Sequence, residues 1–187
     1  MLSIATIAIL ITTTYSGLAQ CPTGFAGPFT TTITVVLPPP CGTTTVQVEY
    51  CVGSTYIGPV SQYRITKVTI VSSGTPCVID GANMRIIAKA LIENNPAGLN
   101  CAGNCPTVIP IMKVGWGNCG HTVNGVWEPC PSAANDGCGD LYEICCRCDG
   151  TLRAFYKGSS PSDQCEYETG CTTMCPPAGT PEPTQCP

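Results

Sequence analysis

The stretch that decides the fold is CGDLYEICCRCDGTLRAFY, residues 138–156. It carries the clearest hairpin signal of the chain, because Asp149-Gly150 tolerates the positive φ of a tight turn and strand-forming runs flank it. It also holds four of the sixteen cysteines, three of them nearly adjacent: Cys145, Cys146 and Cys148. The sequence therefore predicts a disulfide-stapled hairpin at the centre of the molecule.

A two-residue turn at Asp149-Gly150 predicts the register of this hairpin. The expected opposing pairs are Cys148 with Thr151, Cys146 with Arg153, Ile144 with Phe155, and Glu143 with Tyr156. Because successive side chains of a strand point to opposite faces, Cys145 and Cys146 leave the strand in opposite directions. Both faces are mostly apolar, which predicts an interior strand covered on both sides.

Composition places the chain among turn-rich β proteins. It has 187 residues, 20 glycines and 18 prolines, but only 6% aromatic and 11% charged residues. This favours short strands and many turns, with disulfides replacing part of the core. The net charge of -4 comes without any basic run, so nucleic-acid binding is not expected.

The N-terminus is typical of an export signal, because residues 2–11 are apolar and Gly17-Leu18-Ala19 has small residues where a signal peptidase cleaves. The alternatives are a retained β-branched strand and a membrane anchor, although the apolar run is short for a span, so no transmembrane anchor is expected. The predicted organisation is a signal peptide at 1–19, a disulfide-stapled β domain at 20–157, and a Cys/Pro-rich C-terminal segment at 158–187 packed on it.

All sixteen cysteines follow residue 20, and their even number in an exported chain predicts eight disulfides, each contributing about 2–4 kcal/mol. Thiolate metal binding is the alternative, but a zinc ribbon needs two C-x-x-C pairs and a reducing compartment. The predicted disulfide cysteines are Cys21, Cys41, Cys51, Cys77, Cys101, Cys105, Cys119, Cys130, Cys138, Cys145, Cys146, Cys148, Cys165, Cys171, Cys175 and Cys186.

Local patterns predict a mainly β, sandwich-like, disulfide-rich domain of about eight strands, with an extended Pro-rich C-terminal tail. Strands are expected at residues 29–37, 44–50, 63–71, 107–114 and around the Asn124-Gly125 turn, as well as in the central hairpin. Pro110 suggests an edge or a bulge in its strand. One helix is expected at residues 80–94, capped by Asp80, although a strand competes there.

Candidate chemical sites are weak. His121, the only histidine, faces Glu128 across the second hairpin, but the chain has no G-x-S-x-G motif and no spare thiol, so we do not expect an enzyme. Asp136, Asp140 and Glu143 form a weak calcium candidate, with a solvated acidic loop as the alternative. Acidic pairs among Asp163, Glu166 and Glu168, and a sugar-binding surface using Trp116, Trp127 and the seven tyrosines, are less favoured. No cofactor is expected.

These observations predict a secreted, cross-linked structural protein that self-associates by β-strand addition into a filament, appendage or matrix. The expected joining strand consists of Phe29, Thr30, Thr31, Thr32, Ile33, Thr34, Val35, Val36 and Leu37. The alternative is a secreted monomeric binding module, lectin-, inhibitor- or toxin-like, that contacts a glycan or a cell surface.

Overall fold

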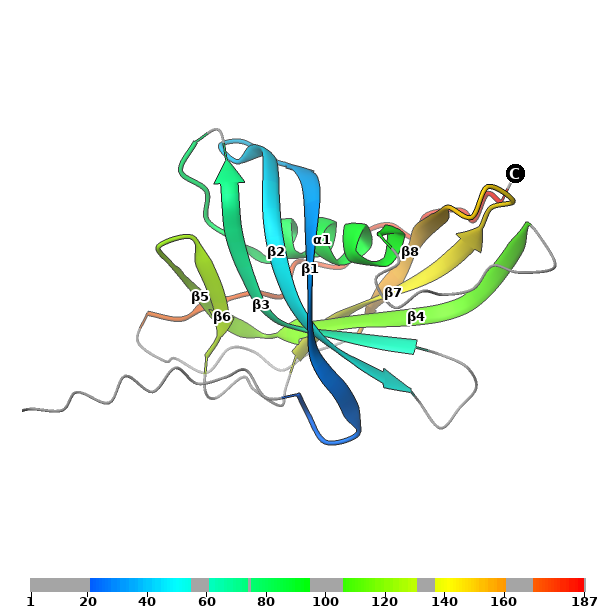
Figure 1. Ribbon diagram of the computed structural model, residues 1–187, viewed down its shortest axis with the longest axis horizontal. Coiled ribbons are helices and arrows are strands. Elements are labelled where there is room, and N and C mark those ends of the chain that lie inside the picture. The colour runs from blue at the N-terminus through cyan, green and yellow to red at the C-terminus, as the bar shows by residue number, and fades with distance from the viewer. Residues whose placement is uncertain are drawn as a thin grey trace, which may run out of the picture.

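The computed structural model describes residues 21–54, 61–73, 75–94, 106–130, 137–160 and 170–186, and it confirms a mainly β protein with one helix (Figure 1). The elements are β1 (Phe25–Leu37), β2 (Gly42–Ser54), β3 (Ser61–Ser73), α1 (Gly81–Glu93), β4 (Thr107–Gly117), β5 (Cys119–Val123), β6 (Val126–Pro129), β7 (Gly137–Cys146), β8 (Leu152–Ser160) and β9 (Thr172–Thr173).

The described strands join into one branched, hydrogen-bonded sheet. Strands β1, β2 and β3 form an antiparallel meander, and β3 continues in parallel to β4, which pairs with β7 and then β8. Further along β3, β6 takes the place of β4 and starts the branch β6–β5–β9. Strand β3 pairs with β2, β4 and β6, and the remaining strands are connected through these three. All described strands therefore belong to one hydrogen-bonded sheet.

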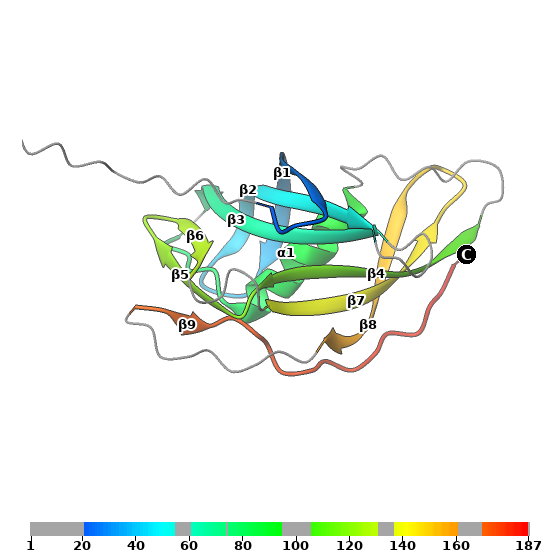
Figure 2. The same ribbon diagram turned by 90° about the horizontal axis from the view of Figure 1, so that it is seen from below.

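Helix α1 connects the parallel strands β3 and β4 and lies against the sheet (Figures 1 and 2). It contacts β1 at one end of the series β1–β2–β3–β4–β7–β8 and β8 at the other, so the sheet curves around it. The predicted apolar stripe, Met84, Ile87, Ala88 and Leu91, is fully buried. Asp80 caps the helix as predicted, accepting a 2.8 Å hydrogen bond from the Asn83 backbone N–H.

The predicted register of the central hairpin is wrong by one residue. The Arg147 N–H donates to the Thr151 carbonyl at 2.9 Å, and the Gly150 N–H donates to the Arg147 carbonyl at 3.0 Å. The loop therefore has three residues, with Gly150 at φ +82° in the left-handed position that this longer loop requires. As a result Cys146 opposes Leu152, Cys145 opposes Arg153, Ile144 opposes Ala154, Glu143 opposes Phe155 and Tyr142 opposes Tyr156.

The other local predictions for β structure are confirmed. Asn124 and Gly125 both have positive φ and place Val123 opposite Val126, as a two-residue turn requires. In β4 the register with β7 shifts between Ile109 and Met112, so the strand has the expected irregularity near Pro110.

The C-terminal segment is tied to the β domain along β7 and β8 (Figure 2). Strand β8 continues to Ser160, so the predicted boundary after residue 157 falls inside a strand. After β9, residues 174–186 form neither helix nor strand. The Glu182 N–H donates to the Tyr156 carbonyl at 2.7 Å, which covers part of the outer edge of β8.

Candidate functional site

The described cysteines form a disulfide framework. Cys119, Cys146 and Cys148 are disulfide-bonded, and no described cysteine is free. Cys101, Cys105 and Cys165 lie outside the described residues. Five disulfides have both members described: Cys21–Cys51, Cys41–Cys77, Cys130–Cys171, Cys138–Cys175 and Cys145–Cys186. Such a density indicates an oxidising, secreted or extracellular environment. Within the described ranges, no helix is both long and apolar enough to span a bilayer.

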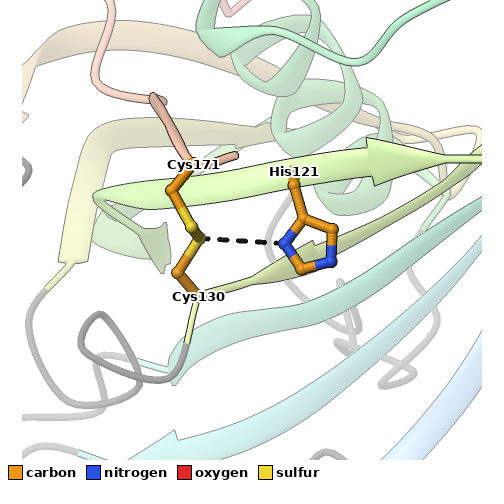
Figure 3. A group of neighbouring side chains, drawn as sticks. All are labelled: His121, Cys130 and Cys171. Atoms are coloured by element: carbon orange, nitrogen blue, oxygen red, sulfur yellow. Dashed lines mark hydrogen bonds between the residues drawn. A yellow bond between two sulfur atoms is a disulfide. The ribbon is translucent and has the colours of Figure 1, made fainter. Parts of the chain in front are cut away.

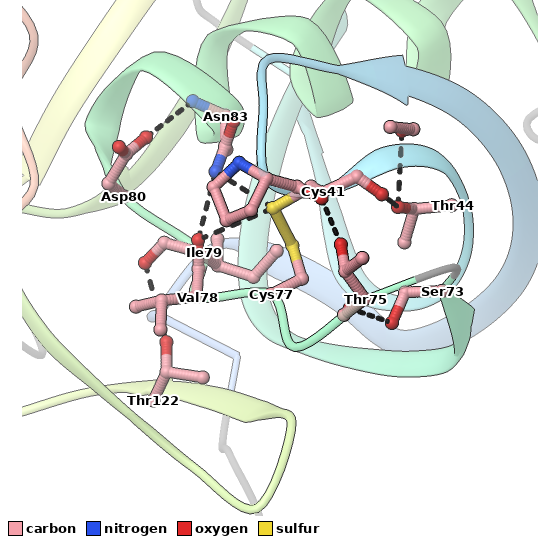
Figure 4. The surroundings of a disulfide bond; sticks show 12 residues. Cys41, Thr44, Ser73, Thr75, Cys77, Val78, Ile79, Asp80, Asn83 and Thr122 are labelled. Carbon is pink, nitrogen blue, oxygen red and sulfur yellow. Dashed lines mark hydrogen bonds between the residues drawn. A yellow bond between two sulfur atoms is a disulfide. The ribbon is translucent and has the colours of Figure 1, made fainter.

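One disulfide fixes the entrance of α1 (Figure 4). Cys41 follows β1 and joins Cys77, which precedes the helix. The buried Asn83 side chain donates to the Val78 carbonyl at 2.9 Å, and its Nδ2 lies 3.8 Å from Cys41 Sγ. The start of the helix is therefore locked to the end of β1 by a covalent bond and a buried amide.

The predicted joining strand lies in β1, which is an edge strand. Among the described residues β1 pairs only with β2. From Ile33 onward its side chains alternate, with Ile33, Val35 and Leu37 buried and Thr34 and Val36 exposed. Val36 is 73% exposed. One face of the strand therefore packs in the core, and its outer edge pairs with no other described strand, although the Asn94 side chain donates to Thr31 Oγ1 at 3.1 Å.

Within its own sequence, this edge strand has little of the usual protection against edge-to-edge pairing after Phe29. Natural edge strands carry charges, prolines or bulges. β1 has no charged residue in its thirteen positions, and its only proline, Pro28, and its register shift lie before Phe29. Residues 29–37 consequently form a regular, uncharged edge, whereas the corresponding edge of β8 is partly covered by the C-terminal segment.

His121 lies beside a disulfide (Figure 3). Its Nδ1 is 3.7 Å from Sγ of Cys130, which is bonded to Cys171. The three ligand atoms lie within 4.8 Å of one another, a spacing that suits a metal ion. Both sulfurs are committed to the disulfide, however, and thiolates are the form that binds metal. While the Cys130–Cys171 disulfide is intact, these three residues therefore do not offer the thiolate ligands of a metal site.

Glu128 opposes His121 in the β5–β6 register as predicted, but its carboxylate binds elsewhere. Glu128 Oε1 lies 2.9 Å from Lys67 Nζ on β3. This hydrogen bond raises the pKa of Lys67. The contacts found at Glu128 are those of a surface ion pair between strands β3 and β6.

The calcium candidates are engaged by groups of the chain itself. Asp140 is fully buried, and its Oδ2 lies 2.7 Å from Arg85 Nε. Glu143 is on the same strand and binds Lys157 at 3.0 Å and the Thr184 hydroxyl. Asp136 lies outside the described residues, as do the acidic residues Asp163, Glu166 and Glu168.

The Asp140 site is a buried polar network that the sequence does not reveal. Ser159 Oγ donates to Asp140 Oδ1 at 2.7 Å, and Arg85 stacks over the Tyr156 ring at 4.8 Å. Burial raises the pKa of Tyr142, whose hydroxyl lies 3.4 Å from Asp140 Oδ2, and the carboxylate raises it further. Helix α1 is thereby joined to β7 and β8 by a satisfied ion pair.

The tryptophans do not form a surface. Trp116 and Trp127 are both 0% exposed. The Trp116 indole N–H donates to the Met174 carbonyl at 3.0 Å, so it anchors the C-terminal segment instead of a sugar. The sugar-binding interpretation of these two residues is wrong.

Comparison with known proteins gives no match: no family model, curated protein or solved structure is detectably similar to this chain.

Proposed function

We propose that this chain is a secreted, disulfide-cross-linked structural protein that self-assembles by strand addition at β1 into an extracellular filament, appendage or matrix. The observation that carries the proposal is the regular, uncharged edge at residues 29–37, whose outer side has no strand partner among the described residues. The disulfides support the proposal, because they stabilise the sheet to which β1 belongs although the chain has few aromatic core residues.

Strand addition gains main-chain hydrogen bonds along the whole edge, each worth about 0.5–1.5 kcal/mol net. Phe29 adds an apolar contact, because its side chain is 43% exposed beside the Tyr50 ring, at 5.8 Å between centroids. If two β1 edges pair with each other, the contact is two-fold symmetric and closes as a dimer. A filament therefore requires β1 to receive a different segment of the next copy.

The test compares Val36→Lys with a matched control, Val71→Lys. Val36 is 73% exposed on the edge strand, and Val71 is 60% exposed on the interior strand β3, which pairs with β2 on one side and with β4 and β6 on the other. A lysine on an edge strand opposes pairing with a second chain. We expect light scattering and electron microscopy to show polymer for wild type and Val71→Lys but only monomer for Val36→Lys. Monomeric wild type at high concentration, or unchanged polymer in Val36→Lys, would contradict the proposal.

A secreted binding module is the second candidate, and one observation favours it. A pocket between α1, β8 and the C-terminal segment is lined by three of the eight basic residues of the chain. A binding module is monomeric and saturable, so the same scattering measurement separates the two functions.

A further inference from the structure

The basic pocket lies at the C-terminal half of α1, between the helix and β8. It has a volume of about 340 Å³ and opens to solvent. Its lining includes Lys89 and Glu93 from the helix, Arg153 and Phe155 from β8, Arg147 directly after β7, and Gln185 from the C-terminal segment. In a chain of net charge -4, this is an unusual concentration of cations.

The two arginines of the pocket are available to a ligand. The Arg147 Nε is buried and has no hydrogen-bond partner among the described residues. A buried, unsatisfied donor is unfavourable, so a ligand acceptor at this atom would be stabilising. Arg153 is exposed, and within the described part of the chain it takes no part in an ion pair.

The carboxylates near the pocket are already bonded to other groups. Glu93 Oε1 accepts from the Ala154 N–H at 3.1 Å. Glu182 holds Lys89 with a 2.8 Å ion pair. Asp149, two residues from Arg147, accepts from the Thr151 N–H and hydroxyl at 2.9 and 2.7 Å. Among the described residues, Glu93 is the one carboxylate that lines the pocket beside the two arginines, and one of its oxygens is already bonded to the Ala154 N–H.

We infer that this pocket binds a carboxylate-bearing saccharide, a uronic acid residue of an acidic polysaccharide. A guanidinium binds a carboxylate with two parallel hydrogen bonds, and the pocket supplies two guanidiniums. The Glu93 Oε2 atom, which has no hydrogen-bond partner among the described residues, and the Gln185 amide offer acceptors and a donor for hydroxyl groups. The half-buried Phe155 gives an apolar wall for the ring carbons.

The size of the pocket favours a sugar over a longer acidic peptide. A volume of 340 Å³ is at the small end of ligand pockets, which suits one or two sugar rings whose chain continues into solvent. This site is independent of strand addition at β1, because its lining comes from α1, β8 and the segments next to them.

Titration calorimetry of the full oxidised protein with a short oligogalacturonate tests the inference, with its neutral methyl ester as the matched probe. We expect the acid to bind and the ester not to bind. Arg147→Gln and Arg153→Gln should each weaken binding by about tenfold or more, because each removes a charged hydrogen-bond donor. Lys67→Gln removes the same charge from β3 and should leave the affinity unchanged. Arg153 is exposed, so its variant folds normally.

The inference would be overturned if wild type did not bind the acid, or if both arginine variants bound it as tightly as wild type does. It would also be overturned if an oligoglutamate bound equally tightly through the same arginines, because the sugar would then not be recognised. Repeating the titration in Val36→Lys separates this site from assembly. Binding retained in that variant while polymer is lost shows that the two functions stand independently.

Discussion

Asp140 and Arg85 form an ion pair on which we expect the stability of the fold to depend. The Asp140 carboxylate is fully buried, so its charge must be balanced by the neighbouring Arg85 guanidinium. We predict that Asp140→Ala lowers the free energy of unfolding by about 3–5 kcal/mol, since it leaves the guanidinium partly buried without its partner. Lys67→Ala is the control, because its ion pair with Glu128 is exposed and worth less than about 1 kcal/mol. Urea denaturation measures both, and equal small losses would contradict the account.

Glu143 gives the molecule a pH dependence of known sign. The Thr184 hydroxyl and then Lys157 lower the pKa of Glu143 below its ordinary 4.5. Its contribution to stability is therefore present above pH 4.5 and is lost as the pH falls through the lowered pKa. Thr184→Val should destabilise the protein slightly at neutral pH, with the difference from wild type shrinking in acid. Thr180→Val, an exposed change in the same segment, should show no such trend in thermal unfolding.

Whether a residue's role could be predicted depended on the sequence separation of its partner. Asp80 caps the helix through Asn83, three positions away, and this local pattern was visible. Arg85 and Asp140 are 55 positions apart, and no local pattern joins them. Of the candidate assembly residues, the strand at 29–37 was predicted from its β-branched residues, but which of its side chains are buried depends on its long-range partners.

At the scale of elements, the start of α1 is the joint most open to a direct test. Asp80→Ala removes the side-chain acceptor for the Asn83 N–H and should lower the unfolding free energy by about 1 kcal/mol. Asp80→Ser keeps an acceptor and should recover most of it. Calorimetric melting temperatures measure the two variants, and a larger loss in the serine variant would rule out capping as the cause.

Two irregular elements show where pattern reasoning fails. In β3 the sequence gives no clean apolar face, because a register shift at Thr66 changes the alternation: Tyr63 and Ile65 are buried before it and Val68 after it. In the central hairpin a third loop residue moves the pairs from Cys146–Leu152 to Tyr142–Tyr156 by one, and a second irregularity after Tyr142 shifts the register back. An extra residue in a strand or loop changes the register without changing composition.

The whole molecule depends on contacts between distant segments that the sequence alone does not pair. Strand β3 precedes α1 in the sequence and β4 follows it, and their parallel pairing joins the strands into one sheet. Local sequence patterns predict hairpins but not such a long-range parallel pair. The C-terminal segment is part of this architecture. Cys145–Cys186 closes a loop with a sequence separation of 41.

We predict that replacing both Cys145 and Cys186 with alanine lowers the unfolding free energy by about 2–4 kcal/mol, because the unfolded chain regains the freedom of that loop. Chemical denaturation under oxidising conditions measures the loss. Limited proteolysis should then cleave first near Glu182, whose contacts with Lys89 and Tyr156 depend on the segment staying in place. Unchanged stability together with an uncleaved segment would show that non-covalent contacts alone hold it.

The central claim is that β1 is the joining strand, and amide hydrogen exchange by mass spectrometry tests it most directly. The oxidised protein is compared as dilute monomer and as concentrated assembly. The account predicts that peptides covering residues 29–37 gain protection in the assembly, while peptides from the interior strand β7 do not change. Assembly that protects other surfaces and leaves β1 as in the monomer would contradict it.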